Sequence, residues 1–348
     1  MFELNLRPCY ILGLPKSTKR METAKRLAAK TCVIFPGALG DFLCFLPALH
    51  ALAVDGKVDL FTRTEFAEIV PENINVQSLE RYEISRLFAP DAENDARVAE
   101  FFSRYEFICS WHGSQQVEFV RSLQSVSHGK ARVFPFRSHE AGIHQADYYL
   151  SCLGYVHAPA IPSVVSTQPQ AVAWCDEYWT RHSLEGKKVL ALAPGSGARE
   201  KNWPGDYFAT TARWWRERSH RVVIALIGPV EQEREDLRWI QDLALTARGL
   251  TLSQVAALLV RADLYLGNDS GITHLAAAVG TQTIALFGPS DPGQWAPRGK
   301  WVTVLRHPVE CSPCDVALMK ECTHRRCLTA FLPDEILRRL NRPSISLT

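Results

Sequence analysis

The strongest constraint on the fold is the alternation of short apolar runs and helical stretches that fills the second half of the chain. We expect strands at 188–193, 221–227, 263–266 and 283–287, and helices at 206–219, 252–260 and 270–279. Thr251 and Gln254 fit a capping box before one of these helices. Because strands joined by crossover helices pair in parallel, the pattern predicts a parallel sheet with ligands beyond the carboxyl ends of its strands.

The first half shows the same pattern less clearly. A β-branched and aromatic run at 31–36 stops at a Pro-Gly turn, and apolar residues then follow helical spacing from Asp41 to Ala53. Further short runs at 57–61, 107–110 and 131–134 predict a second α/β unit. The proline-rich stretch 158–170 is typical of a linker. We therefore expect an extension at 1–30, a first domain at 31–165, and a second at 166–348 that includes a cysteine-rich loop and a terminal helix.

The charge balance and the hydropathy exclude several classes of protein. Lys and Arg number 39 against 37 Asp and Glu, so no overall basic field favours nucleic acid as a partner. No apolar run reaches the roughly 18 residues that a membrane-spanning helix needs, and the first thirty residues lack a signal-peptide core. These features predict a cytoplasmic protein. The basic residues near the N-terminus are compatible with peripheral contact with an anionic membrane.

The first candidate site is the glycine-rich turn from Pro36 to Asp41. Gly37 and Gly40 allow the backbone to approach a ligand closely, and Asp41 would stand at the carboxyl edge of the sheet. Two interpretations remain open from the residues alone. The carboxylate of Asp41 is either a functional group or only the N-cap of the following helix.

Two further candidates lie in the second half. Small residues around Ser196, followed by Lys201, can cradle a phosphate through backbone N–H groups and an ammonium; a plain surface loop is the alternative. The segment 267–274 runs from a strand into a helix, and such a helix start binds anions. Within it, Asp269 suits a sugar hydroxyl or a cation, and His274 is either a ligand contact or a packed helical residue.

Together these motifs resemble the bacterial lipopolysaccharide heptosyltransferases of glycosyltransferase family 9. The matching segments, in order, are Gly37-Ala-Leu-Gly-Asp41, Leu46-Pro-Ala-Leu49, Lys201-Asn-Trp-Pro204, the run from Gly267 to Ala278, and Phe287-Gly-Pro-Ser-Asp-Pro292. The resemblance implies a GT-B architecture, in which two Rossmann-like domains face each other across a cleft. It covers roughly residues 31–335.

The resemblance also implies roles for individual residues. Asp41 matches the general base, Lys201 the phosphate-binding lysine, and Asp269 the sugar-contacting aspartate. The remaining donor-side residues are Ser196, Glu231, Ser270, Gly271, Ile272 and His274, and the acceptor side would include Gly37, Gly40 and His112. The sequence departs from the family at Phe35, where a basic residue is common. This departure lies on the acceptor side, so it argues against the standard inner-core acceptor.

The implied activity is inverting transfer of a sugar from a nucleotide-diphosphate donor. For this family the donor is ADP-heptose and the acceptor is the lipopolysaccharide core, or here another glycan, with peripheral association at the inner membrane as a further expectation. A nucleotide diphosphate is a good leaving group, so one base and positive charge suffice and no metal cofactor is expected. The alternatives are a non-hydrolysing nucleotide-sugar epimerase and a binding module without catalysis.

Four late cysteines form a separate feature. Cys311, Cys314, Cys322 and Cys327 follow a C-x2-C-x7-C-x4-C spacing, with His324 nearby. Four thiolates can hold zinc, but the second pair lacks the usual knuckle spacing. The sequence therefore favours a structural thiol cluster over a metal site.

Overall fold

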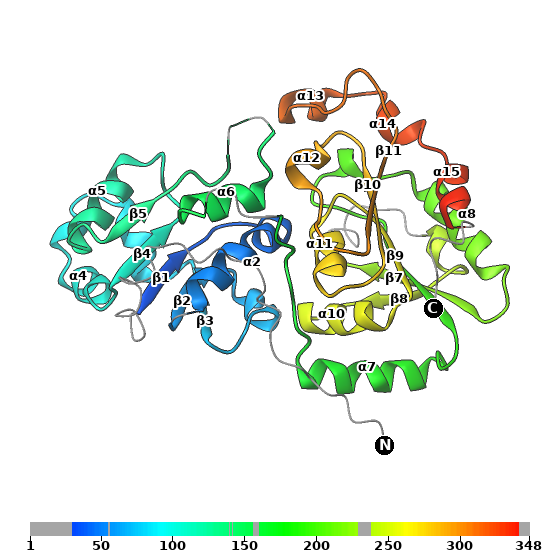
Figure 1. Cartoon of the computed structure of the whole chain (residues 1–348), viewed down its shortest axis with the longest axis horizontal. Coiled ribbons are helices and arrows are strands. Elements are labelled where there is room, and N and C mark those ends of the chain that lie inside the picture. The colour runs from blue at the N-terminus through cyan, green and yellow to red at the C-terminus, as the bar shows by residue number, and fades with distance from the viewer. Residues whose placement is uncertain are drawn as a thin grey trace.

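The structure is a computed structural model that describes residues 30–54, 56–138, 140, 142–155, 160–228 and 238–340. It contains two parallel sheets side by side, each with helices on both faces (Figure 1). The predicted fold class of two parallel-sheet α/β domains is confirmed. The N-terminal extension before Lys30 and the candidate residue Glu231 lie outside the described residues.

The first sheet has five parallel strands in the order β3-β2-β1-β4-β5. Its central strand β1 pairs with β2 on one side and β4 on the other, with Thr31 opposite Val58 and Phe107. The elements are β1 Thr31–Ile34, α2 Leu39–Ala53, β2 Val58–Thr62, η2 Thr64–Ile69, β3 Ile74–Ser78, α3 Tyr82–Ser85, η3 Arg86–Phe88, η4 Ala92–Asn94, α4 Ala96–Ser103, β4 Phe107–Ser110, α5 Val117–Val126, β5 Ala131–Val133 and α6 Gln145–Cys152.

The second sheet has six parallel strands in the order β11-β10-β9-β6-β7-β8. The elements are α7 Pro169–Arg181, β6 Lys188–Ala193, η5 Arg199–Lys201, α8 Gly205–Arg216, β7 Arg221–Ile227, η6 Arg238–Ile240, β8 Leu245–Arg248, α10 Leu252–Arg261, β9 Leu264–Asn268, α11 Gly271–Ala278, β10 Thr283–Phe287, α12 Pro292–Trp295, β11 Val302–Arg306, α13 Val316–Glu321, α14 Arg326–Thr329 and α15 Pro333–Leu340. In both sheets the strand order reverses beside the first strand, and ligands of such sheets bind at this switch point.

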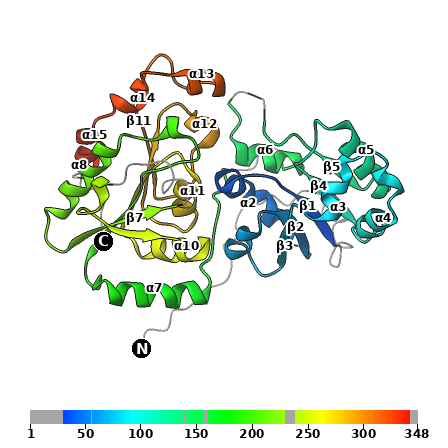
Figure 2. The same cartoon turned by 180° about the vertical axis from the view of Figure 1, so that it is seen from behind.

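The two domains meet through apolar surfaces. One core cluster continues from the first sheet through α2 into α10 and α11 of the second domain, and includes Phe45, Leu46, Leu258 and Leu275. Figure 2 shows α2 and α11 side by side from behind, as Figure 1 does from the front. Helix α2 is buried on nearly all sides, because it packs on its own sheet and also against the other domain. This contact brings the switch points of the two sheets together.

Several local expectations need correction. Helix α2 begins at Leu39, two residues before Asp41, and α7 begins at Pro169 inside the stretch predicted to be linker. Proline is favoured in the first helical turn because its missing N–H would have no partner there. The strands β3, β8 and β11 were not expected from the sequence. The domain division at residue 165 stays a prediction.

Candidate functional site

Asp41 lies in the first turn of α2 and is buried. The N-cap of this helix is Ala38, so the interpretation of Asp41 as a capping residue is wrong. The carboxylate instead projects toward another segment of the same domain. The carboxylate is therefore not used to cap the helix and is available for another role.

Arg137 is the partner of this carboxylate. Its guanidinium donates from Nε to Oδ1 of Asp41 at 3.0 Å, and from Nη2 to Oδ1 and Oδ2 at 2.8 and 3.0 Å. The same guanidinium lies 5.0 Å from the ring centroid of Trp295, in α12 of the second domain. The sequence analysis missed Arg137, because it lies 96 residues from Asp41 in a segment without regular structure.

Gly37 permits close packing within the turn itself, and its predicted approach to a ligand stays a prediction. A Cβ atom at this position would lie 2.3 Å from the ring of Phe35 and 2.9 Å from Cβ of Asp41. Phe35 itself is fully buried and stacks on Phe45 at a centroid distance of 4.3 Å. The ring of Phe35 is therefore part of the core, and it packs against Gly37 in the glycine-rich turn.

Lys201 and Asp269 are brought together as the sequence predicted. Nζ of Lys201 donates to Oδ2 of Asp269 at 2.7 Å, and both side chains are largely shielded from solvent. Lys201 ends η5 after strand β6, while Asp269 follows β9, and these two strands are neighbours at the switch point. Oγ of Ser196 lies 2.6 Å from the carbonyl oxygen of Ala198 and 2.7 Å from Oδ1 of Asn202, so this hydroxyl shapes the loop from within.

The start of α11 lies directly against the start of α2. Ser270 caps α11 by accepting a hydrogen bond from the N–H of Thr273. A Cβ atom on Gly271 would lie 2.8 Å from Cβ of Leu39, so this glycine permits the contact between the helices. The N–H groups of the first turn of α11 carry the positive end of the helix dipole.

His274 lies in the interface between the domains. Its Nδ1 is 3.8 Å from Sγ of Cys44 in α2, and the residue is buried. Burial lowers the pKa of His274 to about 4, so the ring is neutral near pH 7. Its environment is typical of a packed interface residue, the second of the two interpretations left open above.

Cys44 shows that the candidate groups share one environment. Burial is the main reason that the pKa of this thiol is raised, and the negative charges of Asp41 and Asp269 raise it further. One carboxylate belongs to each domain. The charges of the predicted base and of the predicted sugar-contacting residue therefore both act on the same buried thiol.

His112 is not placed with this group by its described contacts. Its ring lies 5.0 Å from that of Phe88 and 5.8 Å from that of Phe119, and burial lowers its pKa. His144, in contrast, lies at the domain interface, where its Nε2 is 2.8 Å from the carbonyl oxygen of Ala296. The acceptor-side role of His112 stays a prediction.

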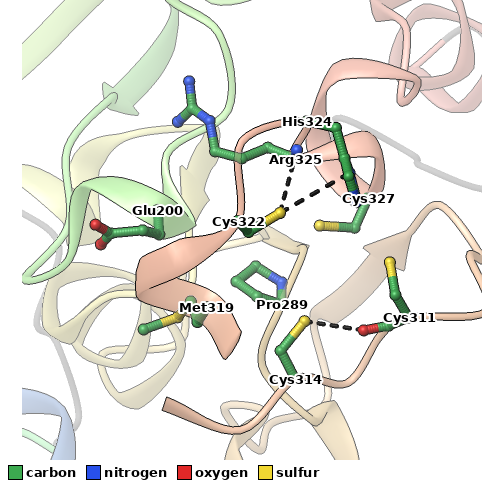
Figure 3. Close-up of a pocket in the computed structure, with 9 residues that line it drawn as sticks. All are labelled: Glu200, Pro289, Cys311, Cys314, Met319, Cys322, His324, Arg325 and Cys327. Atoms are coloured by element: carbon green, nitrogen blue, oxygen red, sulfur yellow. Dashed lines mark hydrogen bonds between the residues drawn. The ribbon is translucent and has the colours of Figure 1, made fainter. Parts of the chain in front are cut away.

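The four late cysteines line one pocket near η5, together with Glu200, Pro289, Met319, His324 and Arg325 (Figure 3). The pocket lies beside the loop that carries Lys201, since Nη1 of Arg325 donates to the carbonyl oxygen of Arg199 at 3.2 Å. The cysteines of the described residues are all free thiols. The predicted thiol cluster is thus brought together.

Two doubly wound domains with charged groups at facing switch points define a GT-B protein. Among solved structures, a glycosyltransferase family 9 protein from Veillonella parvula superposes with a TM-score of 0.67 and 18% identity, covering 90% of this chain and 96% of its own. Escherichia coli ADP-heptose lipopolysaccharide heptosyltransferase II gives 0.65 and 16%, covering 90% of this chain and 97% of its own. These likenesses concern the fold.

Sequence comparison matches the second half of the chain to a known family. Residues 158–324 match the model of glycosyltransferase family 9 (heptosyltransferase). Lipooligosaccharide heptosyltransferase 2 of Campylobacter jejuni is 30% identical over 162 residues, which cover 44% of this chain and 50% of that protein. The chain thus spans about half the length of this curated relative. Residues 158–324 thus resemble glycosyltransferase family 9, as the motifs suggested.

Proposed function

We propose that this chain is an inverting glycosyltransferase that moves heptose, or a related sugar, from a nucleotide diphosphate to a lipopolysaccharide-core or other glycan acceptor. The observation that carries the proposal is the contact between α2, which carries Asp41 of the first domain, and α11, which follows Asp269 of the second. Asp269 is paired with Lys201. Neither domain alone contains all three of Asp41, Lys201 and Asp269.

The chemistry of transfer needs these groups. Asp41 would take the proton from the attacking hydroxyl of the acceptor, and the carboxylate is buried and held by Arg137. Lys201 and the start of α11 would offset the negative charge that grows on the departing diphosphate. Because the diphosphate leaves readily, no residue is needed to protonate it.

The ion pairs of the structure imply what donor binding must change. Lys201 already has an anionic partner, Asp269, at 2.7 Å. A diphosphate would compete for the ammonium, which frees the carboxylate of Asp269 to accept hydrogen bonds from sugar hydroxyls. We therefore propose that donor binding exchanges this pair for two contacts, one to phosphate and one to sugar.

Relatives support the choice of donor. Escherichia coli heptosyltransferase WaaC was solved with ADP, and its TM-score to this chain is 0.61. By analogy, Ser270, Gly271 and Ile272 would hold the phosphates through backbone N–H groups, with Ser196 shaping the adjacent loop. Glu231, which lies outside the described residues, keeps its proposed role toward the ribose.

We propose that transfer itself requires no metal, because Lys201 and α11 supply the positive charge. One relative in fold, TibC of enterotoxigenic Escherichia coli, is described as an iron-containing glycosyltransferase. Its 13% identity carries only the fold to this chain. The metal independence of the reaction is tested by assaying transfer with and without a chelator.

The same proposal places the enzyme in the cytoplasm, at the membrane face where a lipid-linked acceptor would be available. In the part of the chain that the structure describes, no helix is long and apolar enough to cross a bilayer. Contact with the membrane would therefore be peripheral. Flotation of the purified chain with vesicles that contain lipopolysaccharide tests this point.

A product assay separates the proposed function from its alternatives. Incubation with ADP-heptose and a core acceptor should release ADP and yield a glycosylated acceptor. An epimerase would instead give an altered sugar still attached to its nucleotide, and a binding module would give neither product. Parallel reactions with UDP-, GDP- and ADP-hexoses would identify the donor.

A further inference from the structure

The pocket formed by the four late cysteines has no part in the proposed reaction. Cys311, Cys314, Cys322 and Cys327 come from a segment that leaves β11, forms the short helices α13 and α14, and returns to the second domain. Figure 3 shows their side chains around a common space beside Pro289. A pocket lined by four thiols is suited in kind to a metal that prefers sulfur.

This segment has no buried core of its own. From His307 to Arg326, none of the described side chains whose burial is known is buried, and Leu318 is 60% exposed. A stretch of this length without a core of its own is commonly stabilised by disulfides or by a metal. The described cysteines form no disulfide, so a disulfide does not supply this cross-link.

The backbone around Cys322 has a feature of metal-binding turns. The N–H of Arg325 donates to Sγ of Cys322 at 3.4 Å, and Arg325 adopts a left-handed conformation with φ of 43°. A backbone N–H directed at a sulfur stabilises its thiolate form, as hydrogen-bond donors around the ligands do in metal sites.

The other pair, Cys311-x2-Cys314, is fixed to the second sheet. The N–H of Cys314 donates to the carbonyl oxygen of Pro289 at 2.8 Å. Pro289 lies in the loop that follows β10, so this hydrogen bond anchors the first cysteine pair to the body of the domain. Both ends of the thiol cluster therefore have a defined backbone position.

The thiols do not yet converge as a metal would require. Among the described residues, no three Cys, His, Asp or Glu side chains stand close enough together to hold a metal ion. Instead, Sγ of Cys314 donates to the carbonyl oxygen of Cys311 at 2.9 Å, and Sγ of Cys322 lies 3.8 Å from Nδ1 of His324. These are weak local contacts that a metal–sulfur bond would readily replace.

We propose that Cys311, Cys314, Cys322 and Cys327 form a structural site for a thiophilic divalent metal, zinc or ferrous iron, that fastens the 307–326 segment to the second domain. All four positions of a tetrahedral site would be filled by sulfur, so the metal has no open position for a substrate. The site would also steady the loop of Lys201, because Glu200 lines the pocket and Arg325 contacts Arg199. This proposal does not depend on which reaction the enzyme catalyses.

The test measures metal content in the full chain, purified without oxygen and reconstituted separately with zinc and with ferrous iron. Elemental analysis should find about one ion of either metal per chain. Cys314→Ser and Cys322→Ser should lose it, whereas Cys152→Ser, which removes a half-buried cysteine of the first domain, should retain it. The metal that is retained better under competition identifies the native one.

Two further readouts use the wild-type chain and so do not rely on the folding of variants. Cobalt should give thiolate charge-transfer and tetrahedral d–d absorption bands, and a chelator should speed tryptic cleavage after Lys320, Arg325 and Arg326. The proposal is overturned if the reconstituted wild type binds far less than one metal per chain, if cobalt gives no thiolate bands, or if the four cysteines form disulfides instead.

Discussion

The charged residues of the candidate site are paired with each other in the structure. Lys201 and Asp269 form one such pair, and Arg137 and Asp41 form the other. Buried charges need partners, so removing one member of either pair would leave the other without compensation. A variant of these residues must therefore be tested for folding as well as for activity.

Replacing Lys201 with Ala should weaken donor binding and slow transfer. Removing one preorganised positive group from a developing negative charge typically costs about 10²- to 10³-fold in kcat. Steady-state kinetics and calorimetric titration with the nucleotide sugar measure both effects. Lys188→Ala is the matched control, because Lys188 pairs with Asp263 at 2.9 Å in the same domain but at the opposite end of strand β6. Equal losses in the two variants would reject the phosphate-binding role.

Among the helices, the contact between α2 and α11 depends on a glycine. Gly271→Ala would place a methyl group 2.8 Å from Cβ of Leu39 and 3.1 Å from the backbone nitrogen of Gly40. Overpacking of this kind typically costs about 1–3 kcal/mol, so thermal unfolding should begin at a lower temperature. At Gly40 the new methyl group would meet its nearest atom, Cα of Gly271, at an ordinary 3.7 Å. Gly40→Ala should thus keep the wild-type Tm, and a matching loss there would contradict the steric explanation.

The same interface should make stability depend on pH through His274. Its folded-state pKa is about 4, below the ordinary value of 6.5, so the unfolded chain binds the proton more readily between these values. Stability from the neutral ring is therefore fully present above pH 6.5 and is lost as the pH falls toward 4, by at most about 3 kcal/mol. The groups that face this ring include Cys44, Asp269, Lys201 and His144.

Thermal melts at pH 7 and pH 5 measure this effect. The decrease in Tm between the two pH values should be smaller in His274→Gln than in the wild type. His128, which has a left-handed backbone just after α5, provides a comparison through His128→Asn. If His274→Gln loses as much stability on acidification as the wild type, another group is responsible.

The elements also show how far sequence reasoning reaches. The strands at 188–193, 221–227 and 283–287 were predicted with the bounds that the structure has, because they are continuous apolar runs buried inside the sheet. The missed strands β3, β8 and β11 all lie at sheet edges, where one side is partly exposed and the apolar signal is diluted. Arg137 could not be predicted, since only the fold brings it to Asp41.

The molecule as a whole is held together by polar contacts around the apolar interface between its two domains. Arg298 of the second domain donates to both carboxylate oxygens of Asp147 in α6, each at 2.6 Å. Oε2 of Glu68 accepts from the N–H of Ser253 at the start of α10. These contacts hold the domains in the arrangement that places α2, which carries Asp41, against α11.

The arrangement of the domains is therefore part of the site. Asp147→Asn should weaken the contact with Arg298 and raise KM for the donor, while a direct effect on the chemical step is not expected. Small-angle scattering should show a larger radius of gyration for this variant. Unchanged scattering and unchanged KM together would show that the pair does not hold the domains closed.

The rate of sugar transfer by Asp41→Asn is the sharpest test of the proposed base. Asn keeps the size of the side chain and one oxygen that can accept from Arg137, but it loses the negative charge and cannot accept the proton from the acceptor. We predict a folded variant with a lower Tm, because the ion pair with Arg137 is lost, and with nearly unchanged donor binding. Turnover should fall by about 10²- to 10⁴-fold, the usual contribution of a positioned base. An Asn variant that transfers sugar at the wild-type rate would contradict the assignment of Asp41 as the base.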